Sequence, residues 1–158
     1  MFLACVAALV FACRVMFSNV KTARNVDIKK YMGTWHEIAR LDTSFQRGKY
    51  SSQAFYKLNR DGTVFIINSA TDKNGRKVSV SARGYAPNGK DFSRLRISFF
   101  RPFYADYNIL ELDENYQWAL VGGSSKKYLW ILSRTPQMDV ETLNKIINLA
   151  KERNYDVS

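Results

Sequence analysis

Short apolar segments alternate with turn-forming residues along most of the chain, from Tyr31 to Ser133. This spacing suits consecutive antiparallel strands and leaves no room for the helices that connect parallel strands. The pattern predicts eight strands, over Trp35–Thr43, Tyr50–Leu58, Thr63–Ser69, Lys77–Tyr85, Leu95–Phe99, Tyr107–Asp113, Trp118–Gly122 and Tyr128–Ser133.

Dipeptides that contain glycine mark several turns between these strands. Asp61-Gly62, Asn74-Gly75 and Asn88-Gly89 are strong hairpin signals, because a tight two-residue turn needs positive φ at both central positions. Asp113–Asn115 and Gly122–Ser124 supply two further turns.

Eight up-and-down strands would leave two unpaired edges unless the sheet closes on itself. A closed barrel of eight strands has an interior just large enough for one small ligand. The fold class predicted is therefore all-β, an eight-stranded up-and-down antiparallel β-barrel.

One helix is expected after the last strand. Asp139 is a good N-cap, and apolar residues follow it at helical spacing. They are Val140, Leu143, Ile146, Ile147 and Ala150. The opposite face is polar, so the pattern predicts one C-terminal α-helix packed on the outside of the barrel.

The first segment of the chain has the pattern of an export signal. Residues Phe2 to Ala12 are uncharged and almost wholly apolar, too short for a membrane-spanning helix but suited to the apolar region of a signal peptide. Val10–Cys13 resembles a lipobox, in which cleavage before the cysteine leaves a thiol for lipid attachment. We expect residues 1–13 to be a signal or lipobox-like segment with lipidation at Cys13, and 14–25 to be a tether without structure. The alternatives are an ordinary cleaved signal and an uncleaved anchor with an incidental cysteine.

Charge and rare residues exclude several function classes. The formal net charge of +10 suggests contact with anionic surfaces, but the cations are scattered and no nucleic-acid motif is present. Both cysteines, Cys5 and Cys13, lie in the first segment, and His36 is the single histidine. The domain therefore has no internal disulfide and lacks the ligands typical of a zinc or iron enzyme. No metal and no cofactor are expected.

Four motifs in order resemble those of a known family. Gly33-Thr34-Trp35 begins the first strand, Tyr107–Asp113 forms the sixth, and Tyr128–Pro136 carries an arginine just before the helix. Ser98–Tyr104 forms the fourth motif. Over residues 26–158 the chain resembles the lipocalins, and within them the bacterial outer-membrane lipocalins of the apolipoprotein D-like branch. The resemblance implies a lipocalin domain at 26–158.

The first and third motifs have a structural meaning. Arg134 can lay its guanidinium across the Trp35 indole, a cation–π contact of about 1–2 kcal/mol when desolvated. Its remaining donors can bond carbonyls of the segment that crosses the barrel floor. We expect Gly33, Trp35 and Arg134 to be structural residues that close one end and leave the other as a mouth.

The chain departs from the family pattern at two places. His36 stands where the family usually has Tyr, and alternation along the strand turns it outward with Ile38 and Arg40. The family continues past Ser158 with a short apolar strand that flanks the first, so the completeness of the C-terminal end stays open.

The resemblance also implies where a ligand would lie. Tyr56 and Trp130 match pocket positions of apolipoprotein D, and alternation places Tyr128 and Leu132 on the same face as Trp130. On the first strand it places Ala39 inside, together with Glu37, a carboxylate that would need a partner.

A hollow barrel is expected rather than a solid core. The implied ligand is a fatty acid or a lysophospholipid with its headgroup at the mouth. The implied function is lipid storage or transport in maintenance of the cell envelope, by a lipoprotein of the outer membrane that faces the periplasm. A secreted or soluble periplasmic protein is the alternative location.

Three rival functions remain open. A lipocalin-like enzyme acting on a lipid would need His36 as its base, but no Gly-x-Ser-x-Gly motif is present. An integral eight-stranded outer-membrane barrel would need an apolar outer band, against which Arg40 and Lys57 argue. An inert structural module would have a filled barrel. The sequence favours a binding protein that is not an enzyme, and it leaves the oligomeric state open.

Overall fold

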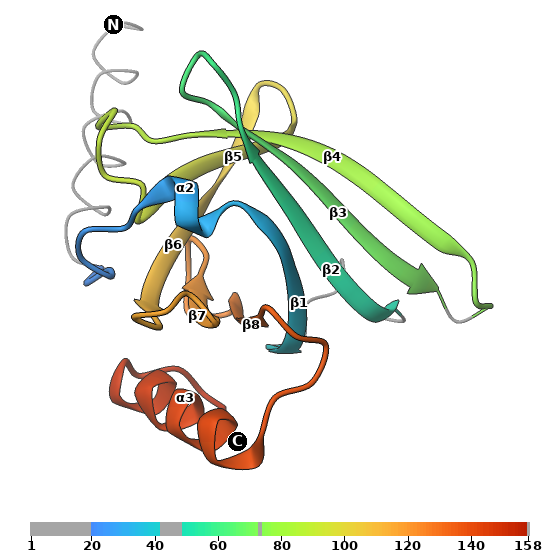
Figure 1. Ribbon diagram of the computed structural model, residues 1–158, viewed down its shortest axis with the longest axis vertical. Coiled ribbons are helices and arrows are strands. Elements are labelled where there is room, and N and C mark those ends of the chain that lie inside the picture. Colours follow the sequence, from blue (N-terminus) through green and yellow to red (C-terminus); the bar gives the residue numbers. More distant parts are fainter. Residues whose placement is uncertain (1–19, 42–48, 73, 158) are drawn as a thin grey trace, which may run out of the picture.

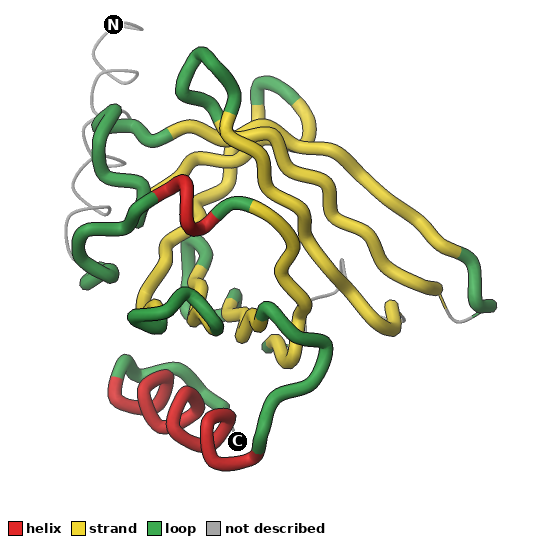
Figure 2. The backbone as a smooth tube through the Cα atoms, in the orientation of Figure 1, coloured by secondary structure: helices red, strands yellow, loops and turns green. Residues whose placement is uncertain are grey.

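A computed structural model describes residues 20–41, 49–72 and 74–157 of the chain. Eight antiparallel strands follow one another in chain order and close into a barrel, which confirms the predicted fold class (Figures 1 and 2). The strands are β1 (Gly33–Arg40), β2 (Lys49–Leu58), β3 (Val64–Asp72), β4 (Lys77–Tyr85), β5 (Arg94–Phe100), β6 (Phe103–Leu112), β7 (Trp118–Gly122) and β8 (Leu129–Ser133). The expected end of the first strand at Thr43, the segment 1–13 and Cys13 lie outside the described residues.

The hairpins lie at the predicted dipeptides, but their turns differ from the expected type. Gly62, Gly75 and Gly89 have φ values of 79°, 78° and 68°, whereas the residue before each of them does not have positive φ. In the β2–β3 turn, the Gly62 amide donates to the Asn59 carbonyl at 3.1 Å. The two-residue turns that we expected are therefore replaced by longer ones, and among their described residues only glycine takes the left-handed conformation.

A β-bulge changes which way the end of β1 faces. The register between β1 and β8 shifts between Glu37 and Ala39, so the alternation that begins at Trp35 is interrupted there. Ala39 and Leu41 pack against the apolar cluster on the outside of the barrel. The expectation that Ala39 faces the interior is wrong, because one extra residue reverses the face of every residue after it.

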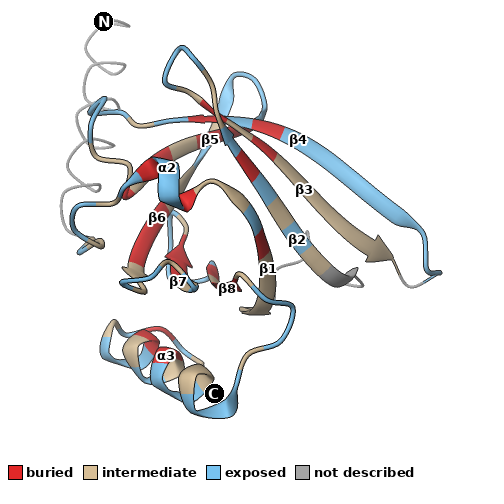
Figure 3. Ribbon diagram, viewed as in Figure 1, coloured by how far each residue is buried: buried red, intermediate tan, exposed pale blue. Residues whose placement is uncertain are grey.

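Two apolar clusters form, one inside the barrel and one outside it (Figure 3). The outer cluster lies between the barrel wall and helix α3 (Val140–Glu152), whose N-cap is Asp139 as predicted. Ile146 and Ala150 are its buried helical residues. Val140 is 72% exposed and does not join the packed face, so that part of the predicted stripe is wrong. The helix covers the outside of the barrel and leaves the interior free.

The segment before the barrel is held against the wall. The Ala23 amide donates to the Ile109 carbonyl at 2.9 Å, and Arg153 donates to the Lys21 carbonyl at 2.7 Å. A short helix that the sequence pattern did not predict, α2 (Ile28–Tyr31), then leads into β1. Residues 20–25, for which we expected an unstructured tether, are thus docked on the domain.

The barrel is paired unevenly around its circumference. β4 pairs with β3 along eight positions but with β5 only through Arg83, Gly84 and Tyr85. Figure 1 shows β2, β3 and β4 extending together beyond the end of this short pairing. The early part of β4 therefore borders an opening in the wall.

Candidate ligand-binding cavity

The interior of the barrel contains a cavity of about 560 Å³. This volume lies within the usual range for sites that hold one small ligand. Its lining is mixed, with aliphatic and aromatic side chains accompanied by serines and amides. The apolar and aromatic members are Ala54, Tyr56, Ile66, Ala70, Val78, Val80, Ile97, Phe99, Tyr104, Ala105, Tyr107, Tyr128, Trp130 and Leu132.

Four of the five expected ligand-binding residues line this cavity. Tyr56 comes from β2, Trp130 and Leu132 come from β8, and Tyr128 lies just before β8. The rings of Tyr128 and Trp130 are stacked, with centroids 6.3 Å apart. Ala39, the fifth, is outside because of the bulge, while β8 keeps an unbroken alternation through these residues.

Three tyrosine hydroxyls meet at the closed end of the cavity. The Tyr107 hydroxyl lies 2.6 Å from that of Tyr31 and 3.0 Å from that of Tyr56. The backbone carbonyl of Tyr31 accepts a hydrogen bond from the Trp35 indole at 2.8 Å. α2, β1, β2 and β6 each supply one member, so the network ties four elements together under the cavity.

These hydroxyls are neutral at ordinary pH. Burial raises the pKa of Tyr56 to about 12, opposed by the hydrogen bond with Tyr107 and reinforced by the charge of Glu37. Burial also raises the pKa of Tyr31 and of Tyr107 well above the usual value. The closed end is therefore polar but uncharged.

Beneath this network, Arg134 closes the barrel as expected. Its guanidinium carbon lies 3.8 Å from the centroid of the Trp35 ring. The same guanidinium donates to the carbonyls of Tyr116, Thr34 and Lys30. Gly33 has a φ of 97° and approaches Arg134 so closely that a Cβ would lie 3.4 Å from its Nη1.

The partner of Glu37, which the sequence did not identify, is Arg40. Glu37 lines the cavity, and its Oε1 accepts a hydrogen bond from the Arg40 guanidinium. Their side chains are only 10% and 18% exposed. Arg40, which we expected on the outer face with His36, is instead turned toward Glu37, again because of the bulge.

A second acid on the lining, Asp106, pairs with Arg96 at 3.3 Å. Burial raises the pKa of Asp106, and the charge of Arg96 opposes that shift. No lysine or arginine belongs to the lining formed by the described residues. The cavity itself therefore offers no unpaired positive charge to an anionic group.

Tyr31 and Tyr107 are functional candidates that the sequence reasoning did not select. Tyr107 opens the sixth-strand motif, and its inward phase could have been inferred from the alternation along that strand. Tyr31 lies in α2, which no periodic signal predicted.

Two features are absent from the described residues. No group of three or more His, Cys, Asp or Glu side chains gathers there at metal-binding distance. Within the same residues, no helix is long and apolar enough to cross a membrane.

Comparison with known proteins identifies the domain. Residues 26–158 match the family model of the lipocalin-like domain. The chain is 38% identical to the outer membrane lipoprotein Blc of Vibrio cholerae, over 99% of this chain and 93% of that protein. It is 39% identical to the protein of the same name from Escherichia coli K12, over 89% of this chain and 80% of that protein.

More distant similarities agree with this family. Apolipoprotein D of Mus musculus is 31% identical over 84% of this chain and 74% of that protein. The solved structure of insecticyanin from the tobacco hornworm Manduca sexta has a TM-score of 0.66 at 20% identity, covering 89% of this chain and 80% of that one. At this identity the structural similarity supports the fold alone.

Proposed function

The chain belongs to the lipocalin family, which binds small hydrophobic ligands, and from this premise we propose that its barrel binds a fatty acid or a lysophospholipid. The observation that carries the proposal is the cavity of about 560 Å³ with apolar and aromatic side chains over much of its wall. A filled interior would have favoured the inert module instead.

The charges around the cavity support one orientation of the ligand. The closed end holds the neutral hydroxyls of Tyr31, Tyr56 and Tyr107, and the two acids on the wall already have arginine partners. A carboxylate or phosphate buried there would lose its hydration without gaining a counter-charge. We infer that the acyl chain points inward and the headgroup stays at the mouth.

The energetics allow useful affinity. A chain of sixteen carbons would gain about 12 kcal/mol gross at about 0.8 kcal/mol per buried methylene. Loss of translational and rotational freedom and ordering of the chain remove a substantial part of that gain. We expect Kd values of about 1 µM or tighter.

The N-terminal segment gives the proposed location. Relatives at 38% and 39% identity are named outer membrane lipoproteins, which supports a place in the cell envelope. We propose that residues 1–13 direct export, that Cys13 carries the lipid anchor and that the barrel faces the periplasm. The role is then storage or transport of lipid in the envelope, by a protein that is not an enzyme.

The ligand is tested by titration with palmitate and with a lysophospholipid. Native mass spectrometry of the freshly purified protein first shows which lipid it already carries. After removal of that lipid, Trp130 fluorescence should change in a saturable way as either ligand enters the cavity. Absence of binding at tens of micromolar would contradict the proposal.

The position of the ligand is tested by two aromatic substitutions. Trp130→Ala removes part of the cavity wall and should weaken binding about tenfold, measured by calorimetry because the reporter is lost. Phe55→Ala is the matched control, since Phe55 precedes Tyr56 on β2 and is 42% exposed on the outer face. Equal affinities of the two variants would show that the ligand binds elsewhere.

A further inference from the structure

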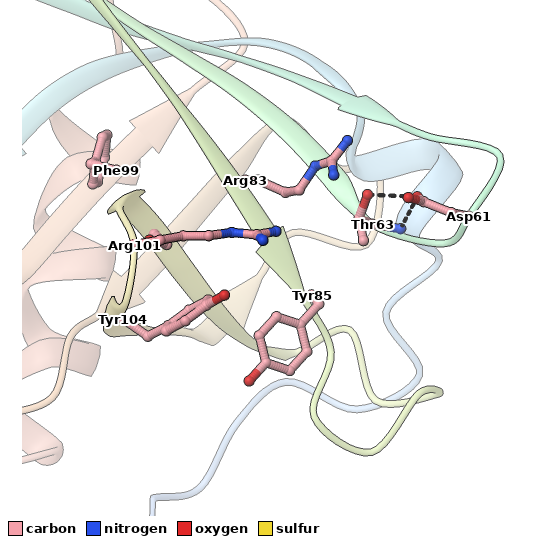
Figure 4. Close-up of a pocket in the computed structure, with 8 residues that line it drawn as sticks. Asp61, Thr63, Arg83, Tyr85, Phe99, Arg101 and Tyr104 are labelled. Atoms are coloured by element: carbon pink, nitrogen blue, oxygen red, sulfur yellow. Dashed lines mark hydrogen bonds between the residues drawn. The ribbon is translucent and has the colours of Figure 1, made fainter.

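A second hollow, of about 530 Å³, lies on the outer wall of the barrel and is distinct from the interior (Figure 4). Arg83 and Tyr85 reach it from the outer face of β4, where they alternate with the buried Ala82 and Gly84. Arg101, between β5 and β6, reaches it from the other side. We call this hollow the outer pocket.

The outer pocket carries excess positive charge. Figure 4 shows the guanidinium groups of Arg83 and Arg101 on either side of the same space. In the part of the chain that the structure describes, neither forms a hydrogen bond or an ion pair. The one acid of the lining is Asp61, whose Oδ1 accepts hydrogen bonds from Thr63 at 2.6 and 3.0 Å. Two arginines against one carboxylate leave a net positive site.

Asp61 is ionised at neutral pH, so the pocket has two positive charges and one negative charge under these conditions. The hydrogen bonds from Thr63, first the hydroxyl and then the amide, lower the pKa of Asp61, and the charge of Arg83 lowers it further. Thr63 bonds one oxygen of this carboxylate, and neither Arg83 nor Arg101 forms an ion pair with Asp61, so both guanidinium groups stay able to donate to a ligand.

Neutral donors complete the site. Ser98 of β5 lies opposite Arg83 of β4. Its side chain is buried, since the residue is only 8% exposed, and its Oγ has no hydrogen-bond partner. A buried hydroxyl without a partner is unfavourable and is commonly a position where a ligand or water completes the site. Tyr85 and Tyr104 stand beside it with their rings edge to face, at a centroid distance of 5.6 Å. Figure 4 shows the Tyr104 hydroxyl turned toward Tyr85, and the Tyr85 hydroxyl turned away from the two guanidinium groups.

We propose that the outer pocket binds a small oxyanion of the phosphate class. Guanidinium groups donate in a planar fork that matches phosphate oxygens, and two such forks face one space here. The Ser98 hydroxyl would gain the partner that it lacks. The adjoining tyrosine rings can cover an organic group attached to the phosphate.

The phosphate could be free or part of a lipid. Phe99 and Tyr104 line both the outer pocket and the interior cavity, so the two spaces adjoin where β4 and β5 separate. The lipid case rests on the proposed function: a lysophospholipid whose chain lies inside would place its phosphate in the outer pocket, through this gap in the wall, instead of at the mouth. Binding of free phosphate does not depend on that function.

The site is tested by calorimetric titration of the full-length protein with inorganic phosphate at low ionic strength. Wild type should bind saturably with one site. Arg83→Gln and Arg101→Gln should each weaken binding by at least about tenfold, because each removes a charged donor. Ser98→Ala should weaken it less and should leave tryptophan fluorescence unchanged. Arg24→Gln, at an exposed position away from the pocket, removes the same charge and should have no effect.

The source of the phosphate is tested by comparing palmitate with a lysophospholipid in Arg83→Gln. If the lipid headgroup occupies the outer pocket, the lysophospholipid should lose affinity while palmitate keeps it. If Arg83→Gln binds both lipids like wild type but binds inorganic phosphate more weakly, the outer pocket binds free phosphate. No binding of phosphate to wild type at about 10 mM, or equal weakening in Arg24→Gln, overturns the site. Failure of palmitate alone would overturn the interior function and not this site.

Discussion

At the scale of single residues, Arg134 makes both kinds of contact that the sequence motifs predicted. It covers the Trp35 ring, and it supplies donors to carbonyls of three segments that meet at the barrel floor. Cation–π geometry alone would constrain two residues, whereas the added hydrogen bonds join α2, β1 and the β6–β7 turn. The contact is therefore a clamp on the closed end.

This clamp predicts a coupled loss of stability. Trp35 is fully buried, so Trp35→Ala should lower the free energy of unfolding by about 3–5 kcal/mol. Arg134→Ala should cost about 1–3 kcal/mol, because the carbonyls lose charged donors. The double variant should lose less than the sum, as contacting residues do. Urea unfolding measures all three, with Arg24→Ala as an exposed control, and strict additivity would mean that the two residues act independently.

The tyrosine network predicts a dependence on alkaline pH. The pKa of Tyr56 is raised to about 12, so above pH 10 the unfolded chain releases this proton while the folded protein keeps it. The stabilising contribution is complete below pH 10 and falls as pH rises from about 10 to 12, by about 2–3 kcal/mol. Tyr56→Phe should remove this part of the decline. Urea unfolding at several pH values tests it, and identical slopes for both proteins would contradict it.

At the scale of elements, alternation located the strands well and failed at one point. Lys77–Tyr85 and Trp118–Gly122 appear with the expected bounds, the described ends of most others shift by a few residues, and the sixth strand extends further, back to Phe103. The alternation of inward and outward side chains also placed Tyr56, Trp130 and Leu132 inside, because β2 and β8 run through these residues without interruption. These side chains were predictable since each depends only on its own strand.

The bulge in β1 was not predictable in the same way. It depends on how β1 meets β8 across the closure of the barrel, and that pairing joins the first strand to the last. The sequence around Glu37 carries no glycine or proline to signal it. Ala39 was therefore placed inside wrongly and Arg40 outside wrongly. The role of Tyr31 in the tyrosine network was also missed, because α2 has too few residues to give a periodic signal in the sequence.

Helix α3 predicts a separation between stability and binding. Ile146 is fully buried against the outer cluster, so Ile146→Ala should cost about 2–5 kcal/mol. Val140→Ala, at an exposed position on the same helix, should change stability by less than about 0.5 kcal/mol. Both should bind palmitate like wild type below their melting temperatures, because the helix lies outside the cavity. A weaker palmitate affinity for Ile146→Ala alone would show that the helix shapes the interior.

At the scale of the whole molecule, the distribution of charge supports the proposed place beside an anionic membrane surface. The net charge is +10, yet no lysine or arginine of the described residues lines the interior cavity. The positive charge therefore lies outside the cavity lining, where an anionic surface can attract it. Residues 20–25 are docked on the barrel wall, so the proposed anchor at Cys13 is separated from the docked part of the domain only by residues 14–19 of the sequence.

The proposed anchor at Cys13 predicts where the full-length protein resides. If Cys13 is acylated, the protein made in a bacterial host should incorporate a radiolabelled fatty acid and partition into the detergent phase. Cys13→Ala should abolish both and move the protein to the soluble fraction. Cys5→Ala is the matched control, since it removes the other thiol inside the expected signal and should change neither result. A wild-type protein that is exported, unlabelled and freely soluble would reject the anchor and leave simple secretion, without affecting ligand binding in the barrel.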